Sequence, residues 1–405
     1  MLEFETMEEQ RLMTSYSEHQ KVLALALATV FVGSGRDTQH GNVLVTDKCP
    51  FNKAFMLYAN ALQDPNASPL DIVEQAKITF LHGKKKFGRA HRHSFMLENN
   101  LAHAYLQSGD FRAASAHYLS VLSYHEEVMG DESQDYFFTL LDIIHLIKAF
   151  KLNANKQNSN TPPVFSSLPS LLNKLLSVTD ALVISTPESA LLYREQALKA
   201  AHSHPGLMPL TRIRDLALDY ARDTIRTYGK LSEAAIEARF FLGKIYFDMK
   251  AIRKALIEFV AVLDALDEIL AFSHPYALAS HARLVSLYER QGKSNLATRH
   301  CQAVGKLRVW DNSTNQQALH ANLPNYAKVL GGTYNKSSTC DGLICLSFDI
   351  SSLGYTENIS VISSTKPALN ELVINAFSTW RFAPKYENGA PVVARQQQIQ
   401  INIPN

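Results

Sequence analysis

Histidine and lysine side chains gather in one short stretch, HGKKKFGRAHRH at residues 82–93. Clustered cations of this kind could bind a phosphate group or an acidic peptide, because their charges share one sign. His91 and His93 alone do not make a zinc site, since zinc takes about four ligands and no others follow at metal spacing. We expect a solvated turn between two helices, with anion binding as the alternative, and no metal.

Two of the four cysteines, Cys340 and Cys345, are close in sequence. Residues five apart can form a disulfide only where the backbone bends, and Gly342 between them permits a bend. If the chain is exported, a Cys340–Cys345 disulfide is plausible; the alternative is two separate thiols. Cys49 and Cys301 have no evident partner.

Motifs of the common catalytic sites are missing from the sequence. It has no Gly-rich phosphate loop and no Gly-x-Ser-x-Gly nucleophile turn. The carboxylates of DALDEIL (264–270) have the spacing of an ordinary exposed helix face. The formal net charge of +2 gives no reason to expect nucleic acid or a membrane surface as partner. The sequence therefore predicts a protein that is not an enzyme and that takes no cofactor.

The 405 residues, 46% hydrophobic and 19% charged, are those of a folded chain with two or three domains. KVLALALATVFVGSG (21–35) holds an apolar run too short to cross a bilayer, which takes about 20 residues. It matches the hydrophobic region of a signal sequence, although the residues before it are acidic. We predict a signal sequence at 1–34 and a periplasmic protein. Residues 21–35 could also associate the protein with the membrane. The alternative is a buried helix in a cytoplasmic protein.

A repeated pattern organises the middle of the chain. The segments 101–114, 242–255 and 284–297 place Leu, Tyr and Ala at the same offsets, with the Tyr one helical turn after the Leu. Gly109 and Gly292 occupy the turn that follows, and Lys250 replaces them in the middle copy. Each copy thus predicts two helices joined by a tight turn, the small Ala allowing close packing.

The spacing between copies, 42 residues from Tyr246 to Tyr288, resembles a long form of the tetratricopeptide repeat (TPR). The resemblance implies an α-solenoid over 55–308, whose groove would bind a peptide. Asn, Ser and Pro are frequent in 151–170, which we expect to form a loop between two helical blocks.

Composition changes after the helices. Residues 309–322 have the polar character of a linker. In 341–355 apolar residues alternate with others, and 357–363 alternates again, so two strands are expected. A helix over 367–380 and a last long strand over 390–403 follow. The predicted order for a small α+β domain at 323–405 is strand, strand, helix, strand.

This tail resembles the C-terminal domain of TonB-family energy transducers. The resemblance rests on the alternating strand from Gly342 to Ile350 and on a later signature, with a Trp-Arg-Phe-x-Pro run and an Asn-Gly turn: Trp380, Arg381, Phe382, Pro384, Asn388 and Gly389. The predicted fold class is therefore mainly α, a TPR-like solenoid followed by a small TonB-type α+β domain.

The family resemblance implies a periplasmic domain that contacts an outer-membrane receptor, and an inner-membrane energising complex, in TonB-dependent transport. Contact by sheet-edge pairing fits the physics, because an exposed edge offers unpaired N–H and C=O groups. Our candidate edge residues lie on the last strand: Val393, Arg395, Gln397, Ile399 and Ile401. The glutamines of that strand have a second interpretation, which is simply to keep a bare edge soluble.

Two features depart from the family's pattern. The sequence shows neither a full membrane anchor nor a Pro-rich spacer, so energised transport by this chain alone is in doubt. Three hypotheses follow: a periplasmic adaptor of a TonB-like system, a structural TPR scaffold of the cell envelope without energy coupling, and a cytoplasmic peptide-binding solenoid.

Overall fold

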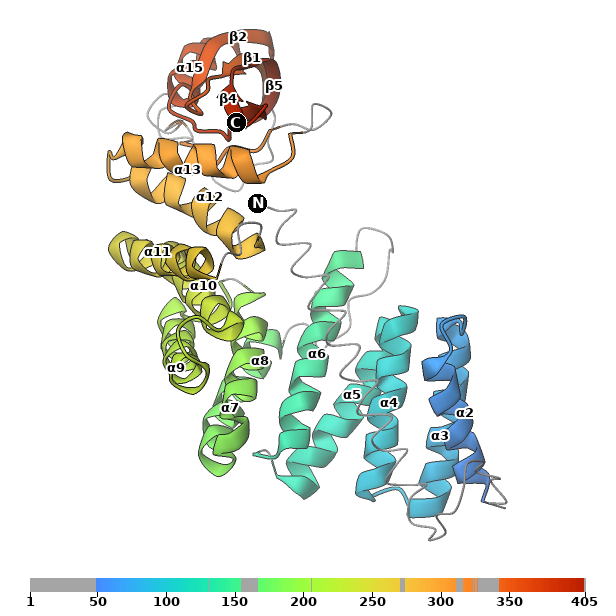
Figure 1. The fold of residues 1–405 in the computed structure, drawn as a ribbon. Helices are drawn as coiled ribbons and strands as arrows, with labels where there is room; N and C mark the ends of the chain where they lie inside the picture. Colours follow the sequence, from blue (N-terminus) through green and yellow to red (C-terminus); the bar gives the residue numbers. More distant parts are fainter. Residues whose placement is uncertain are drawn as a thin grey trace. The chain divides into compact units, whose positions relative to one another are not determined.

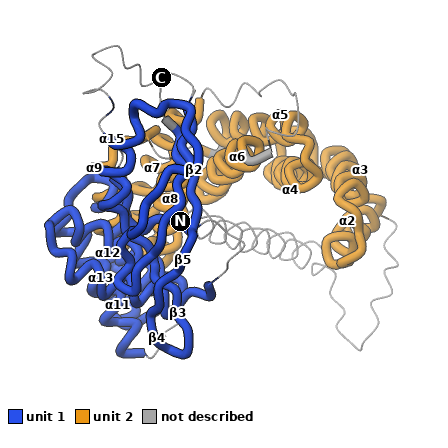
Figure 2. Tube along the Cα trace, turned by 90° about the horizontal axis from the view of Figure 1, so that it is seen from above, with its two compact units in different colours: residues 1–5, 221–405 blue, residues 6–220 orange. Residues whose placement is uncertain are grey.

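The computed structural model describes residues 49–130, 132–153, 167–204, 206–269, 274–310, 316–322, 324, 326 and 342–403. The predicted signal at 1–34, Cys340 and most of the predicted loop at 151–170 lie outside these residues. Two compact units divide the chain between Tyr220 and Ala221, with residues 1–5 assigned to the second (Figure 2).

Every described element of the unit ending at Tyr220 is a helix (Figure 1). Its long elements are α2 (Pro50–Gln63), α3 (Pro69–Phe87), α4 (Arg92–Ser108), α5 (Phe111–Tyr124), α6 (Gln134–Asn153), α7 (Leu168–Ser185), α8 (Ala190–His202) and most of α9 (Leu210–Tyr228). Short turns of other helix types are η1 (His125–Met129) and η4 (Pro187–Ser189).

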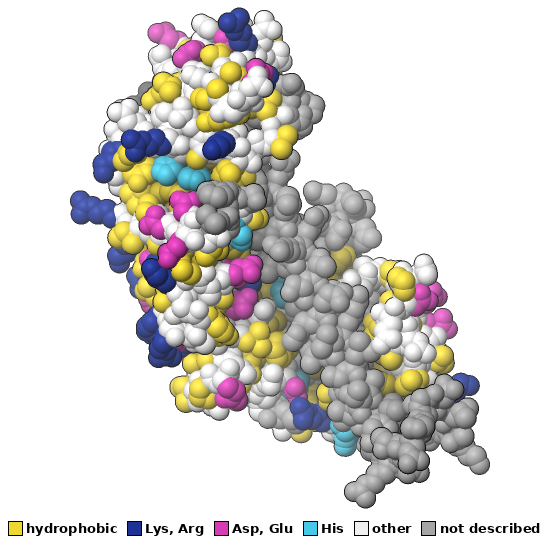
Figure 3. Space-filling model, viewed as in Figure 1, with side chains coloured by type: hydrophobic (Ala, Val, Ile, Leu, Met, Phe, Trp, Pro, Cys, Tyr) yellow, Lys and Arg dark blue, Asp and Glu magenta, His cyan; other side chains and the backbone are white. Residues whose placement is uncertain are grey.

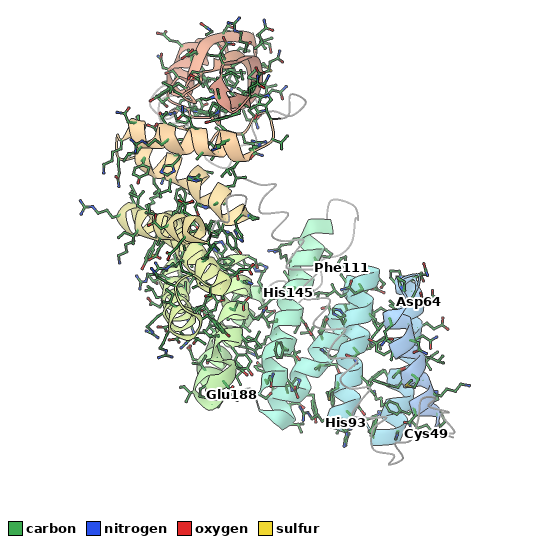
Figure 4. The ribbon with its side chains drawn as sticks, in the orientation of Figure 1. Cys49, Asp64, His93, Phe111, His145 and Glu188 are labelled. Carbon is green, nitrogen blue, oxygen red and sulfur yellow. The ribbon has the colours of Figure 1, made fainter. Side chains whose placement is uncertain are left out.

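Local sequence signals set the ends of these helices. The Ser68 hydroxyl oxygen accepts a hydrogen bond from the backbone N–H of Asp71, and the backbone N–H of Ser68 donates to the Asp71 carboxylate. These two bonds form a capping box at the start of α3. Asp110 caps α5 through the N–H of Ala113. In Figure 4, Cys49 and Asp64 lie at opposite ends of α2, because one residue precedes the helix and the other follows it.

The three repeat copies fold as helical hairpins, which confirms the predicted fold class. They are α4–α5, α10 (Glu233–Asp248) with α11 (Ile252–Glu268), and α12 (Pro275–Glu289) with α13 (Ser294–Leu307). The small residue of each copy is buried at the helix contact: Ala114, Ala255 and Ala297. The turn residue has a positive φ in every copy: 81° at Gly109, 58° at Lys250 and 70° at Gly292.

Among the described helices, α7 alone is long and apolar enough to cross a membrane by length and composition. Leucines on one side of α7, such as Leu172 and Leu175, are buried, and the helix packs against α6 and α8. A buried core helix passes the same test of composition.

The C-terminal domain contains a three-stranded antiparallel sheet. Its elements are β1 (Gly342–Ile350), β2 (Thr356–Ser364), η5 (Pro367–Leu369), α15 (Asn370–Phe377), β3 (Lys385–Glu387), β4 (Ala390–Val392) and β5 (Ala394–Ile403). The strand order is β2-β1-β5. Alternate residues of β1 are buried, as the sequence predicts, and form the core with α15: Ile344, Leu346, Phe348 and Ile350.

The structure differs from the expected tail in two places. The strand expected over 390–403 divides, because β4 pairs with β3 around the Asn388–Gly389 turn and only β5 joins the main sheet. The helix expected over 367–380 begins as η5 and ends at Phe377, so Trp380 lies beyond it.

Candidate functional site

β5 lies at an edge of the three-stranded sheet. It pairs with β1 on one side, from Gly342 opposite Ile403 to Ile350 opposite Ala394. No described strand pairs with its other side, and β2 forms the opposite edge. Among the described strands, β5 is therefore an edge strand, the kind of strand to which a partner segment can be added.

The candidate edge residues do not share one face of the sheet. Ile401 is buried in the core, and Ile399 packs partly against it. Gln397 is half-buried, Arg395 is exposed, and Val393 precedes the strand. The side chains that alternate with Ile399 and Ile401 face outward instead: Gln398, Gln400 and Asn402.

A bulge interrupts β5 at Gln396, whose φ is 55°. Its backbone N–H donates to Asp349 Oδ1 at 2.8 Å, and the other oxygen of Asp349 accepts from Asn358 Nδ2 at 2.8 Å. Asn358 lies on β2 and also has a positive φ. These hydrogen bonds lower the pKa of the Asp349 carboxyl, so one ionised group on β1 fastens both outer strands. The sequence analysis did not single out Asp349. The signal was an acidic residue in a strand whose other side chains are apolar or small.

The aromatic residues of the signature fill the domain core. Phe382 is fully buried and packs at 5.1 Å between ring centroids from Phe348. The indole of Trp380 packs on Phe377 and donates to the carbonyl of Asn322 at 2.9 Å. Trp380 therefore ties the segment before the domain to its core.

Arg381 makes contacts outside its own domain, which the sequence did not predict. Its side chain is 1% exposed, and its guanidinium reaches out of the domain to Glu289 of α12 and to Thr298 Oγ1 of α13, at 2.7 Å for the latter. It also donates to the Leu353 carbonyl at 2.9 Å and stacks over the ring of Tyr355 at 3.7 Å. A single buried cation thus joins the TonB-like tail to both helices of the last hairpin.

Close backbone contacts surround this cation. A Cβ on Gly354 would meet the carbonyl of Phe382 and would lie 3.0 Å from Cys301 Cβ, and one on Gly305 of α13 would meet the carbonyl of Pro384. Gln302 Nε2 donates to the Ser352 carbonyl at 3.2 Å. The C-terminal domain is therefore packed directly on α13.

Part of the segment expected as a linker belongs to this interface. His320 exchanges backbone hydrogen bonds with Arg381. Its ring lies 3.1 Å from the hydroxyl of Ser286 on α12, measured at Nδ1. Residues 316–322 thus add a third connection between the last hairpin and the domain.

The basic stretch at 82–93 forms the end of α3 and the start of α4. Lys84 lies over the ring of Phe80 at 5.1 Å, and Lys86 lies over Phe51 at 4.9 Å. His91 caps α4 by accepting from the N–H of His93. These contacts are those of a helix-to-helix turn, and among the described residues no group of three metal-ligating side chains is present.

The family model for the C-terminal domain of the Gram-negative bacterial TonB protein matches residues 336–403. The tail is a TonB C-terminal domain. The match covers the described strands, β5 included, together with α15 and the Trp-Arg-Phe run.

Solved structures resemble the helical part. A TPR-like repeat protein of Podosopora anserina, assigned as a kinesin light chain, is 15% identical with a TM-score of 0.43; the match covers 55% of this chain and 99% of that one. A single-substitution variant of that protein has the same identity and TM-score and covers 56% of this chain. The comparison with curated proteins finds no match. The chain joins TPR-like hairpins to a TonB-type domain.

Proposed function

We propose that the chain is a periplasmic adaptor of a TonB-like system, in which β5 pairs with an extended segment of an envelope protein. The single observation that carries this proposal is the edge of β5, which no described strand covers in a domain of the TonB family. Outward-facing Gln398 and Gln400 lie along this edge, so a partner strand would meet polar, uncharged neighbours.

The helical repeats supply the second contact of the adaptor, a protein segment held by the first helices of successive hairpins. In the unit ending at Tyr220 these are α4, α6 and α8, and α6 contacts both α4 and α8. Asn99 of α4 donates to Asp142 of α6 at 3.1 Å, but Asp142 is fully buried, so this hydrogen bond joins the two helices and is not open to a peptide.

One observation favours the scaffold without energy coupling as a second candidate. Family transducers reach their receptor through a long spacer, whereas here Arg381 fixes the domain on α12 and α13. A domain held in this way fits a stationary connector. The two candidates differ in whether the β5 contact depends on the proton-motive force.

Site-specific photocrosslinking in cells tests both. A crosslinking amino acid at Gln398 or Gln400 of β5 is compared with one at Ser360 or Ser363, exposed positions on the opposite edge strand β2. The adaptor predicts a crosslink to a membrane-fraction protein from β5 alone, lost when an uncoupler is added. A β5 crosslink that persists with the uncoupler supports the scaffold, and equal crosslinks from β2 contradict edge pairing.

Export is tested separately by the N-terminal mass of the protein from fractionated cells. A periplasmic species that begins near residue 35 supports the adaptor and the scaffold alike. An intact N-terminus in the cytosol contradicts both and favours the cytoplasmic solenoid.

A further inference from the structure

Each of the three repeat hairpins has a polar contact between its two helices at the same position. The partners are nineteen residues apart in every case: Glu98–His117, Arg239–Glu258 and His281–His300. The first partner comes three residues before the repeat leucine, and the second lies on the following helix. The position is thus a fixed feature of the repeat, and its chemistry differs from copy to copy.

The first two copies carry an acid with a base, and the last carries two histidines. His117 Nδ1 lies 3.1 Å from a Glu98 oxygen, and Arg239 donates to Glu258 at 3.0 Å. In the last copy His281 Nδ1 and His300 Nδ1 are 2.8 Å apart. A contact between two such nitrogens requires one to donate and the other to accept, so at least one ring must be neutral.

Protonation of both rings would place two N–H groups and two positive charges against each other. Two other charged groups act on the pair. Asp267 of α11 raises the pKa of His281, but by less than burial lowers it. Arg299 lowers the pKa of His300, whose ring stacks on Tyr288. Burial lowers the pKa of His281, and lowers that of His300 to about 4. Histidine side chains reach the surface over α12 and α13 (Figure 3), so protons have access to this hairpin.

The pair lies on the α12 side of α13, and the C-terminal domain packs on other residues of the same helix. Thr298, Gln302 and Gly305 of α13 contact Arg381, Ser352 and Pro384. Arg381 also holds Glu289 of α12, so its guanidinium can bind both helices only while they stay together. A separation of α13 from α12 would therefore loosen the domain as well.

We propose that the His281–His300 contact makes the attachment of the C-terminal domain to the last hairpin sensitive to acid. The sign follows from linkage. The attached state favours neutral rings, so the attachment is strongest above the ordinary histidine pKa and weakens as the pH falls through it. With a pKa of 6.5 when α12 and α13 are apart and about 4 when they are together, His300 alone disfavours the closed hairpin by about 30-fold near pH 5. This is the upper limit for the weakening of the attachment, which Arg381 makes to both helices. No partner or transport activity is needed for this property.

Cys301 reports the attachment directly. Its side chain is fully buried between α12, α13 and Gly354, and burial raises its thiol pKa to about 12. The experiment measures labelling of Cys301 by a pyridyl disulfide, with the labelled peptide identified by mass. The rate for the same cysteine in the urea-unfolded chain at the same pH is divided by the rate in the folded chain, which gives a protection factor.

The matched variant is His281→Glu, which builds the acid–histidine contact of the first repeat into the last one. We expect the protection of Cys301 in the natural chain to fall at least tenfold, and up to about 30-fold, between about pH 7.5 and about pH 5. In His281→Glu the fall should be less than about threefold, because protonated His300 then donates to a carboxylate. His320 is common to both chains, so the difference between them isolates the pair.

Two results would overturn the proposal: constant protection in the natural chain, or an equal fall in His281→Glu. His300→Gln provides a second test if His281→Glu does not fold, since it removes the titrating ring and should also flatten the profile. His117→Gln, at the same repeat position in α5, is the control and should leave the acid response of Cys301 unchanged. Loss of β5 crosslinking with an intact acid response would count against the proposed function and not against this proposal.

Discussion

The first and last clear hairpins, α4–α5 and α12–α13, have matching residues at equal spacings along the sequence. In both, a tyrosine of the first helix stacks on a histidine of the second, Tyr105 on His117 and Tyr288 on His300, with an interplanar angle of 4°. They differ in what the second helix must carry. The last hairpin holds a whole domain through Arg381, whereas α5 packs against another helix, α6. One repeat framework therefore supports two different attachments.

The largest expected effect concerns the buried cation at this attachment. Glu289→Gln leaves Arg381 buried without its carboxylate, which should lower the free energy of unfolding of the C-terminal region by about 3–5 kcal/mol. Urea unfolding followed by tryptophan fluorescence measures this, because both tryptophans of the chain, Trp310 and Trp380, pack in this region.

Glu258→Gln is the control for that measurement, since it breaks the half-buried contact with Arg239 in the preceding hairpin. It should cost about 1 kcal/mol or less. Equal losses for the two variants would mean that Arg381 is no more important than an ordinary contact between repeat helices.

The second effect compares two glycines with nearly equal backbone angles. Gly354 has a φ of 82° and Gly109 has a φ of 81°. Alanine at Gly109 meets open space and should cost about 1 kcal/mol through backbone strain alone, whereas at Gly354 it meets the Phe382 carbonyl and Cys301 and should cost about 2–4 kcal/mol.

The same urea titration measures both substitutions. Exposure of Cys301 to thiol reagents in Gly354→Ala, at neutral pH, distinguishes a loosened domain from a loss confined to the turn. If Gly354→Ala costs no more than Gly109→Ala, the domain does not pack on α13 as closely as the structure has it.

A third effect concerns an acid in the other unit. Asp142 is fully buried on α6, and desolvation raises its pKa well above the ordinary value. A raised pKa of a carboxyl means that folding is opposed at neutral pH and is favoured as the pH falls. Asp142→Asn keeps an acceptor for Asn99 and should therefore raise the stability at about pH 7.5, with a gain that shrinks in acid.

The difference between Asp142→Asn and the natural chain, measured by urea unfolding at several pH values, gives this profile. It runs opposite to the acid response expected for the His281–His300 contact, so the two regions would be told apart by sign. A gain that grows toward acid would contradict the raised pKa of Asp142.

The parts of this molecule that follow local rules could be predicted from sequence, and the parts that depend on contacts across the chain could not. The Leu–Tyr–Ala spacing predicted the hairpins, and the alternation in β1 predicted its buried face, because both patterns are short and periodic. Arg381 was recognised as part of a signature, but its partner Glu289 is 92 residues away and follows no spacing rule. The difference in facing between Arg395 and the later candidate residues on β5 was missed for a similar reason, since the bulge at Gln396 shifts the alternation and depends on Asp349.

The smallest effect tests how strictly the hairpin turn needs its special conformation. Lys250 occupies the turn with a φ of 58°, where the first and last copies have glycine. A left-handed conformation costs a residue with a Cβ about 1–2 kcal/mol, part of which glycine loses again through its greater freedom when unfolded. Lys250→Gly should therefore raise the free energy of unfolding by about 0.5–1 kcal/mol, and Gly292→Lys should lower it by a similar amount. Urea unfolding of the two variants decides this, and a Lys250→Gly chain no more stable than the natural one would indicate that the lysine side chain, which is exposed, gains an interaction that offsets the strain.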